Sequence, residues 1–243
     1  LRILREELLP VFEHLGDVHA RAVTMGKVAD ILQARGQFDE ALRILREELL
    51  PVFERLGDVH LRAVTMGKVA DILQTRGQLD EALHIRLEEL PVFEGLGDVR
   101  ARAVTMGKVA DIQQMRGQLN EALHIRLEEE LPVYERLDDV RERAVTMGKV
   151  ADILQAQGQL DEALRILREE QLPVYERLGD VRSLLVARAN LAIALLQRGR
   201  TEDEPEALEY LQFALQAARA HDYSREVEQL ESLFRQLSQH RPT

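Results

Sequence analysis

The chain of 243 residues contains no cysteine and no tryptophan, only 4% aromatic residues, 7 prolines and 14 glycines. Without cysteine there are no disulfides, no thiolate metal sites and no thiol catalysis. The longest apolar run, 183–196, is too short to span a bilayer and contains Arg188 and Asn190. A net charge of −11 disfavours nucleic acids and anionic lipid surfaces, because both are negatively charged. Proteins, peptides or cations remain as partners, and since nothing suggests secretion we expect a cytoplasmic protein.

The residues that are abundant are Ala, Leu, Glu and Arg, which lose little side-chain freedom in a helix, so the composition predicts an all-α protein. The string RAVTMGKVADI begins at Arg21, Arg62, Arg102 and Arg143, with spacings of 41, 40 and 41 residues, and DEAL or NEAL follows each copy. A helical repeat of this length indicates an α-solenoid of stacked antiparallel helix pairs, in which each pair buries its apolar face against its neighbours. A diverged fifth copy follows from Val181.

Each repeat is predicted to hold two helices. The first, called the A helix, starts near Asp17 as its cap and stops at Gly36. Its apolar stripe consists of Met25, Val28, Ala29 and Leu32. The second, called the B helix, starts behind Asp39 as its cap and ends at Gly57. Its buried stripe is predicted to consist of Ala41, Leu45, Leu49, Phe53 and Leu56.

A proline interrupts every B helix, at positions 10, 51, 91, 132 and 173. Apolar spacing continues after Pro51, so we expect a kink there and not a break. The 40-residue repeat lost its residue just before Pro91, where a bent helix absorbs the change with least damage. The order Ile44-Leu45-Arg46 also becomes Ile85-Arg86-Leu87 in the next copy, which rotates the leucine by about 100° around the helix.

The repeat A-x-x-M-x-x-V-A-x-x-L-x-x-x-G-x-[FL]-[DN]-E-A-L-x-x-L resembles a tetratricopeptide repeat. The positions that carry the resemblance are Met25, Val28, Ala29, Leu32, Gly36, Phe38, Ala41 and Leu45. Since the usual unit has about 34 residues, the chain is similar to the longer variant of about 42 residues found in motor light chains and in sensor arms of bacterial signalling ATPases. The resemblance implies a right-handed superhelix with a concave wall of A helices.

On this basis the sequence divides into seven segments. They are 1–15, a partial repeat with a B helix only; 16–57, 58–97, 98–138 and 139–179, repeats one to four; 180–220, the diverged fifth repeat; and 221–243, a C-terminal capping helix.

By analogy with the family, recurring polar residues of the A helices line a groove that binds a partner segment. They are Lys27, Asp30, Gln33, Lys68, Asp71, Gln74, Lys108, Asp111, Gln114, Lys149, Asp152 and Gln155. An equally weighted interpretation is that each Lys and Asp pair with each other or with the next repeat and keep a polar face solvated. Gly26 and its copies lie inside A helices at a cost of about 1 kcal/mol each. We expect close contact between adjacent A helices there, with room for a ligand as the alternative.

The remaining polar motifs do not predict catalysis or a cofactor. His84 with Glu88, and His124 with Glu128, share a helix face, but two ligands do not make a metal site, and a solvated surface is the preferred interpretation. Thr24 has no obvious base next to it. We therefore expect no enzyme activity, no metal and no cofactor.

The leading hypothesis is a protein-interaction scaffold that binds a partner peptide or protein segment in the groove, as part of a larger signalling protein such as a sensor arm. The alternative is a structural self-assembly module. The chain starts inside a repeat, which suggests a fragment of something longer. The first B helix lacks a preceding A helix, so Leu1, Leu4, Leu8 and Phe12 are predicted to offer an apolar surface for a weak homodimer that pairs two N-terminal ends.

Overall fold

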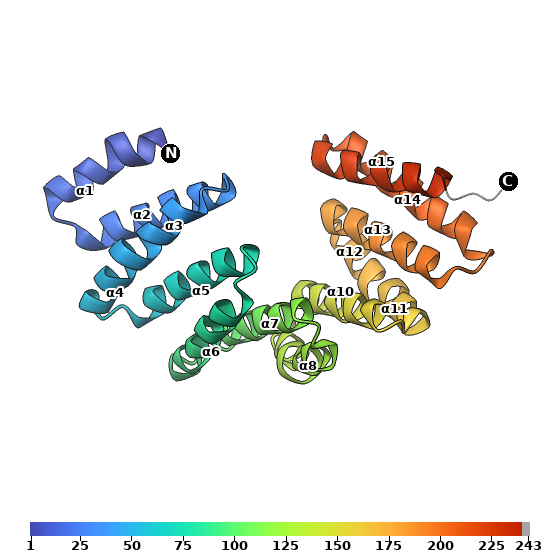
Figure 1. Ribbon diagram of the computed structural model, residues 1–243, viewed down its shortest axis with the longest axis horizontal. Coiled ribbons are helices and arrows are strands. Elements are labelled where there is room, and N and C mark those ends of the chain that lie inside the picture. The colour runs from blue at the N-terminus through green and yellow to red at the C-terminus, as the bar shows by residue number, and fades with distance from the viewer. Residues whose placement is uncertain (240–243) are drawn as a thin grey trace. The chain divides into compact units, whose positions relative to one another are not determined.

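The computed structural model describes residues 1–239, and within them the chain is all-α with no strand (Figure 1). Helix follows helix in antiparallel pairs, as the α-solenoid prediction requires. The chain forms two compact units, Leu1–Ile125 and Arg126–Thr243. The division falls inside the predicted third repeat, 98–138, and the repeat boundaries themselves stay a prediction from sequence.

Five A helices recur with nearly constant length. Their bounds are α2 (Val18–Ala34), α5 (Val59–Thr75), α7 (Val99–Met115), α10 (Val140–Ala156) and α13 (Val181–Arg198).

Most of the B helices contain a π-helical segment, labelled η. Their bounds are η1 and α1 (Leu4–Leu8, Leu9–Leu15); α3, η2 and α4 (Phe38–Arg43, Ile44–Leu49, Leu50–Leu56); α6 (Leu79–Gly95); α8, η3 and α9 (Leu119–His124, Ile125–Glu130, Leu131–Arg136); α11, η4 and α12 (Leu160–Ile166, Leu167–Gln171, Leu172–Leu178); α14 (Asp203–Ala220).

The A helices begin and end at the predicted signals. The Asp17 carboxylate accepts a hydrogen bond from the Ala20 amide at 2.8 Å, and the equivalent aspartates cap the other four A helices. Gly36 follows the first A helix with a φ of 74°, a left-handed conformation that glycine adopts without strain.

The B helices do not start as predicted. The N-cap is Gln37, and Asp39 lies in the first turn, where its charge suits the positive end of the helix dipole. The Asp39 carboxylate instead accepts a hydrogen bond from Arg76 of the next repeat at 2.7 Å. An aspartate in this position therefore joins two repeats and does not cap its own helix.

As predicted, the prolines do not break the B helices. In the 41-residue repeat, the Leu50 amide bonds to the Leu45 carbonyl, an i to i−5 bond that closes the π-helical segment ahead of Pro51. A π-helical turn accommodates one extra residue in a helix. In the 40-residue repeat that residue is missing, and α6 runs as a regular α-helix with Pro91 inside it. The repeat without this residue therefore lacks the π-bulge, and its B helix α6 stays continuous.

The core of the first unit follows the predicted stripes. Met25, Val28, Ala29 and Leu32 are buried on α2, and Ala41, Leu45, Leu49 and Phe53 are buried on the B helix. Leu56 was predicted to be buried, but 46% of its surface is exposed, because it lies in the last turn of α4 beyond the neighbouring helices.

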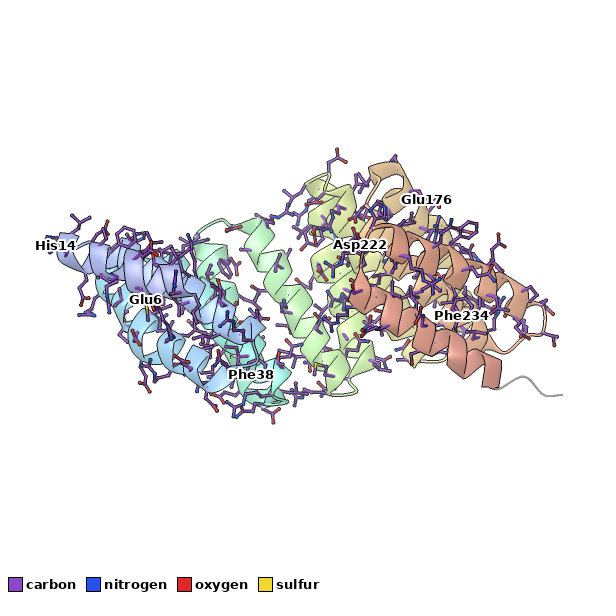
Figure 2. All side chains as sticks on the ribbon, turned by 90° about the horizontal axis from the view of Figure 1, so that it is seen from above. Glu6, His14, Phe38, Glu176, Asp222 and Phe234 are labelled. Atoms are coloured by element: carbon purple, nitrogen blue, oxygen red, sulfur yellow. The ribbon has the colours of Figure 1, made fainter. Side chains whose placement is uncertain are left out.

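In the second unit α14 packs against α13 and against the terminal helix α15 (Ser224–Gln239). Leu191 and Leu195 of α13 and Leu211 of α14 are fully buried, and Leu230 of α15 is buried as well. Asp222 lies in the turn before α15 and Phe234 on it (Figure 2). The final helix starts at Ser224, within the predicted capping segment 221–243, and residues 240–243 of that segment lie outside the described residues.

The first helix exposes part of its apolar surface, but not the predicted set. Leu1, Leu4 and Phe12 are half-buried, whereas Ile3, Leu8, Val11 and Leu15 are exposed by 39% to 68%. The side chain of Leu4 packs against the core of the first unit, which explains why it is covered.

Candidate functional site

Two pockets recur at equivalent positions of successive repeats in the first unit. Each lies between an A helix, the B helix of the same repeat and the A helix of the next. The first, called the apolar pocket, has a volume of about 240 Å³ and is lined by Ala22, Val23, Gly26, Lys27, Asp30, Leu49, Phe53, Leu61, Val64, Thr65 and Lys68. The second, called the polar pocket, has about 360 Å³ and is lined by Val64, Gly67, Lys68, Asp71, Arg86, Glu89, Phe93, Asp98, Arg100, Ala101, Val104, Thr105 and Lys108.

The floor of the apolar pocket is formed by Leu49, the residue two positions before Pro51. Leu49 is 2% exposed, and its Cδ1 atom lies 3.7 Å from where a Cβ atom on Gly26 would stand. The interior glycine therefore faces a side chain of the B helix at an ordinary contact distance. Our expectation of close contact between adjacent A helices is wrong at this position, because the neighbour that approaches is on the B helix.

The floor of the polar pocket carries an ion pair where the apolar pocket has leucines. Arg86 is 5% exposed and Glu89 is 1% exposed. The Arg86 Nη1 atom donates to both Glu89 carboxylate oxygens, at 3.1 and 3.3 Å, and Nη2 donates to Asp71 at 2.7 Å. A Cβ atom on Gly67 would stand only 2.8 Å from Arg86 Nη1. Gly67 thus leaves space for a charged floor.

The sequence carried a signal for this floor, but its meaning was missed. Leu45 is buried in the first complete repeat, whereas the order Ile85-Arg86-Leu87 places an arginine in the core and exposes 50% of Leu87. From the sequence alone, this change of order predicts only that the leucine is rotated around the helix. Glu89 and the buried hydroxyl of Thr105 were not predicted either.

The environment of Glu89 makes it the most perturbed carboxyl in the first unit. Burial removes water from the carboxylate and raises its pKa from 4.5 to about 7, although Arg86 and a 3.4 Å hydrogen bond from Thr105 oppose the shift. At neutral pH, Glu89 therefore exchanges a proton with solvent.

The predicted Lys and Asp residues of the first unit form pairs between successive repeats. Lys68 donates to both oxygens of Asp30, at 2.6 and 2.8 Å, and Lys108 donates to Asp71 at 3.0 Å. This is the pairing with the next repeat that the alternative interpretation describes. The same residues line the two pockets, so the pairing does not remove them from the pocket surface.

The other predicted groove residues are not gathered in these two pockets. Lys27 is exposed and lines the apolar pocket together with its copy Lys68. Half-buried residues outside both pockets are Gln33, Gln74, Asp111 and Gln114, and, in the second unit, Lys149, Asp152 and Gln155. Gln74 Nε2 lies 3.3 Å from the sulfur of Met115 in the next A helix.

The histidine pairs lie on the surface, as the preferred interpretation had it. His84 and Glu88 contact each other at 3.1 Å with both side chains exposed. Within residues 1–239, no group of three or more His, Cys, Asp or Glu residues has the arrangement of a metal site. In the same part of the chain, no helix combines the length and the apolar character that crossing a membrane requires.

Comparisons with known proteins agree with this geometry. A family model described as Tetratricopeptide repeat matches residues 21–47 and 143–169, and a second model of that description matches 185–203. The search of curated proteins finds no match.

Among solved structures, BtubC (BKLC) from P. vanneervenii is similar with a TM-score of 0.73 and 20% identity, over 91% of this chain and 89% of that one. The nearly identical TPR-like repeats assigned to a kinesin light chain of Podospora anserina give a TM-score of 0.64 and 22% identity, over 82% and 96%. The STAND protein PH0952 of Pyrococcus horikoshii, which has a tetratricopeptide repeat sensor, gives 0.65 and 15%, over 87% and 35%. At these identities the likeness concerns the fold alone.

Paired helices that repeat every 40 or 41 residues and bury the Ala and Leu stripes of their neighbours define a helical repeat protein. Three segments of the chain match models of the tetratricopeptide repeat, and the chain has the fold of the tetratricopeptide-like repeat proteins to which it is similar.

Proposed function

We propose that the chain is a protein-interaction scaffold that binds an extended partner segment along the A helices of the first unit. The observation that carries this proposal is the recurrence of one pocket design in successive repeats. Each pocket combines apolar walls, a buried aromatic ring and a rim of paired Lys and Asp side chains. Such a surface suits a chain whose side chains alternate along its length.

The chemistry of the described residues supports binding over catalysis. Repeat scaffolds of this kind are generally non-enzymatic. Where a hydroxyl meets a carboxyl in the polar pocket, Thr105 at 3.4 Å from Glu89, both side chains are buried and Arg86 also binds the carboxyl. PH0952, to which the chain is similar in fold, is a signal transduction ATPase with a tetratricopeptide repeat sensor. By analogy, we propose that the chain is the sensor arm of a larger protein in the cytoplasm.

Site-specific photocrosslinking tests this function. A photoreactive amino acid at Val64, which lines both pockets, or at Val104 is expected to crosslink the partner that copurifies with the chain. The matched control is Leu87, which is 50% exposed on α6 and lines neither pocket. Equal crosslinking from Leu87, or none from either valine, would contradict groove binding.

Self-assembly is the second candidate, and one observation favours it. Leu8 and Val11 are 39% and 51% exposed, whereas their counterparts Leu49 and Val52 are buried and half-buried. The first helix therefore presents a surface that the other repeats cover, and a second copy of the chain is the proposed occupant.

A further inference from the structure

The polar pocket has a different electrostatic design from the apolar pocket, although both occupy the same place in the repeat. Its floor and rim hold four charged groups within hydrogen-bonding distance of one another: Arg86, Glu89, Asp71 and Lys108. Asp71 Oδ1 accepts from both Arg86 and Lys108, at 2.7 and 3.0 Å. With both carboxyls ionised, the cluster is neutral.

The pocket also contains a buried donor that is not satisfied. Among the residues that the structure describes, the Nε atom of Arg86 is buried and has no hydrogen-bond partner. Leaving such a group unpaired in the interior costs about 1–3 kcal/mol. The donor lies below the accessible surface of the floor, so an acceptor reaches it only when the side chains of the floor shift.

We propose that the polar pocket is a proton-linked anion site, in which a carboxylate of the partner segment binds together with a proton that Glu89 takes up. The proposal rests on the groove-binding function proposed above. Protonation of Glu89 removes one negative charge and leaves the cluster with one net positive charge. The entering carboxylate restores neutrality, and no bond other than the O–H bond of Glu89 forms.

The position of Glu89 explains why the proton goes there. Its carboxyl is the most buried in the cluster, and its pKa of about 7 lies within one pH unit of neutrality. The carboxyl of Asp71 is a third exposed and accepts hydrogen bonds from Arg86 and Lys108, so it keeps more contact with solvent than the carboxyl of Glu89. The apolar pocket has Leu49 in place of Glu89 and is not expected to respond to pH in this way.

Other charged groups border the polar pocket and enter the test. They are Lys68 on α5, Arg100 on α7 and Asp98 at its N-cap. His60 Nε2 lies 3.8 Å from Asp98. A His60→Gln variant therefore serves as the control for this contact at the rim.

The experiment is a titration of the full chain with sodium acetate, followed by NMR at the Arg86 Nε–H signal, with sodium chloride at the same ionic strength as reference. Acetate stays ionised at both pH 6.0 and pH 8.0. With a pKa of about 7, Glu89 is mostly protonated at the lower pH and mostly ionised at the higher one. We expect an association constant about tenfold larger at pH 6.0.

Two variants and one direct measurement decide the outcome. Glu89→Gln fixes the neutral form, so it is expected to bind acetate equally at both pH values, whereas His60→Gln is expected to keep the tenfold difference. The Glu89 carboxyl carbon of the wild-type chain is expected to titrate near pH 7, which checks the linkage without any variant. Binding that does not depend on pH, or a pH dependence that persists in Glu89→Gln, would overturn the inference. Crosslinking from Val64 would still support the groove in that case, so the two proposals fail separately.

Discussion

Lys68 of one repeat donates hydrogen bonds to both carboxylate oxygens of Asp30 in the repeat before it, at 2.6 and 2.8 Å. Both side chains are partly exposed, at 31% and 49%. A pair of this kind between exposed groups contributes about 0.2–1 kcal/mol to stability. The pair therefore contributes little to the fold, while it places a cation and an anion on the rim of the apolar pocket.

The first prediction concerns the four equivalent lysines. Joint replacement of Lys27, Lys68, Lys108 and Lys149 by Gln is expected to abolish partner capture and to leave helicity unchanged, because the side chains are exposed or half-buried. Circular dichroism and a pull-down with the purified variant measure the two effects. Capture at the wild-type level would remove the lysines from the binding surface.

Two matched glycine substitutions test the pocket floors. Gly26→Ala is expected to stabilise the chain by about 0.5–1 kcal/mol, because the new Cβ meets only Leu49 at an ordinary 3.7 Å. Gly67→Ala is expected to destabilise it, because its Cβ would stand 2.8 Å from the buried Arg86 Nη1 atom, which two carboxylates hold in place. Urea unfolding of both variants gives the comparison, and equal effects would contradict the charged floor.

The buried ion pair itself is predicted not to stabilise the fold. The double variant Arg86→Leu/Glu89→Leu has leucine at both positions, as the preceding repeat has with the buried Leu45 and Leu49, and is expected to be at least as stable as wild type. The single variant Arg86→Leu leaves Glu89 buried without its cation and is expected to lose about 3 kcal/mol at pH 8. The loss should shrink at pH 5, where Glu89 is neutral. A double variant less stable than this single one would contradict the prediction.

Glu89 also predicts the pH dependence of stability. Its pKa is raised from 4.5 to about 7 on folding, so between these values the folded chain holds a proton that the unfolded chain has released. The stabilisation is complete below pH 4.5 and is lost as the pH rises through 7. Relative to Glu89→Gln, wild type is expected to lose up to about 3 kcal/mol of unfolding free energy between pH 5 and pH 8. Urea unfolding of both proteins at the two pH values measures it, and parallel curves would contradict it.

The last prediction concerns association through the first helix. A weak, concentration-dependent dimer is expected, and Leu8→Glu with Val11→Glu is expected to abolish it. Leu15→Glu is the matched control, because Leu15 is exposed and its counterpart Leu56 in the next B helix is exposed as well, by 46%. Sedimentation over a wide concentration range decides the matter: a strict monomer, or a dimer insensitive to the double variant, contradicts the prediction.

The sequence by itself determined the repeat, the helix pairs and most of the core. Periodic apolar residues such as Val28, Ala29 and Leu32 allow one buried face, and Asp17 and Gly36 mark the ends of the helix by local hydrogen bonding and backbone geometry. These features depend on neighbours within a few residues, so a pattern in the chain is enough to predict them. The prediction that Asp39 caps its own helix was wrong, because its hydrogen-bond partner, Arg76, belongs to the next repeat.

Only the tertiary structure decided what lies at the floors of the pockets. Arg86, Glu89 and Asp71 come from two helices, and Thr105 and Lys108 from a third, so no local spacing relates them. The change from Leu45 to Arg86 is visible in the sequence, but its meaning depends on whether that face is buried and on which carboxylates reach it. Burial in turn sets the proton affinity of Glu89, because the cost of removing a carboxylate from water depends on the helices packed around it.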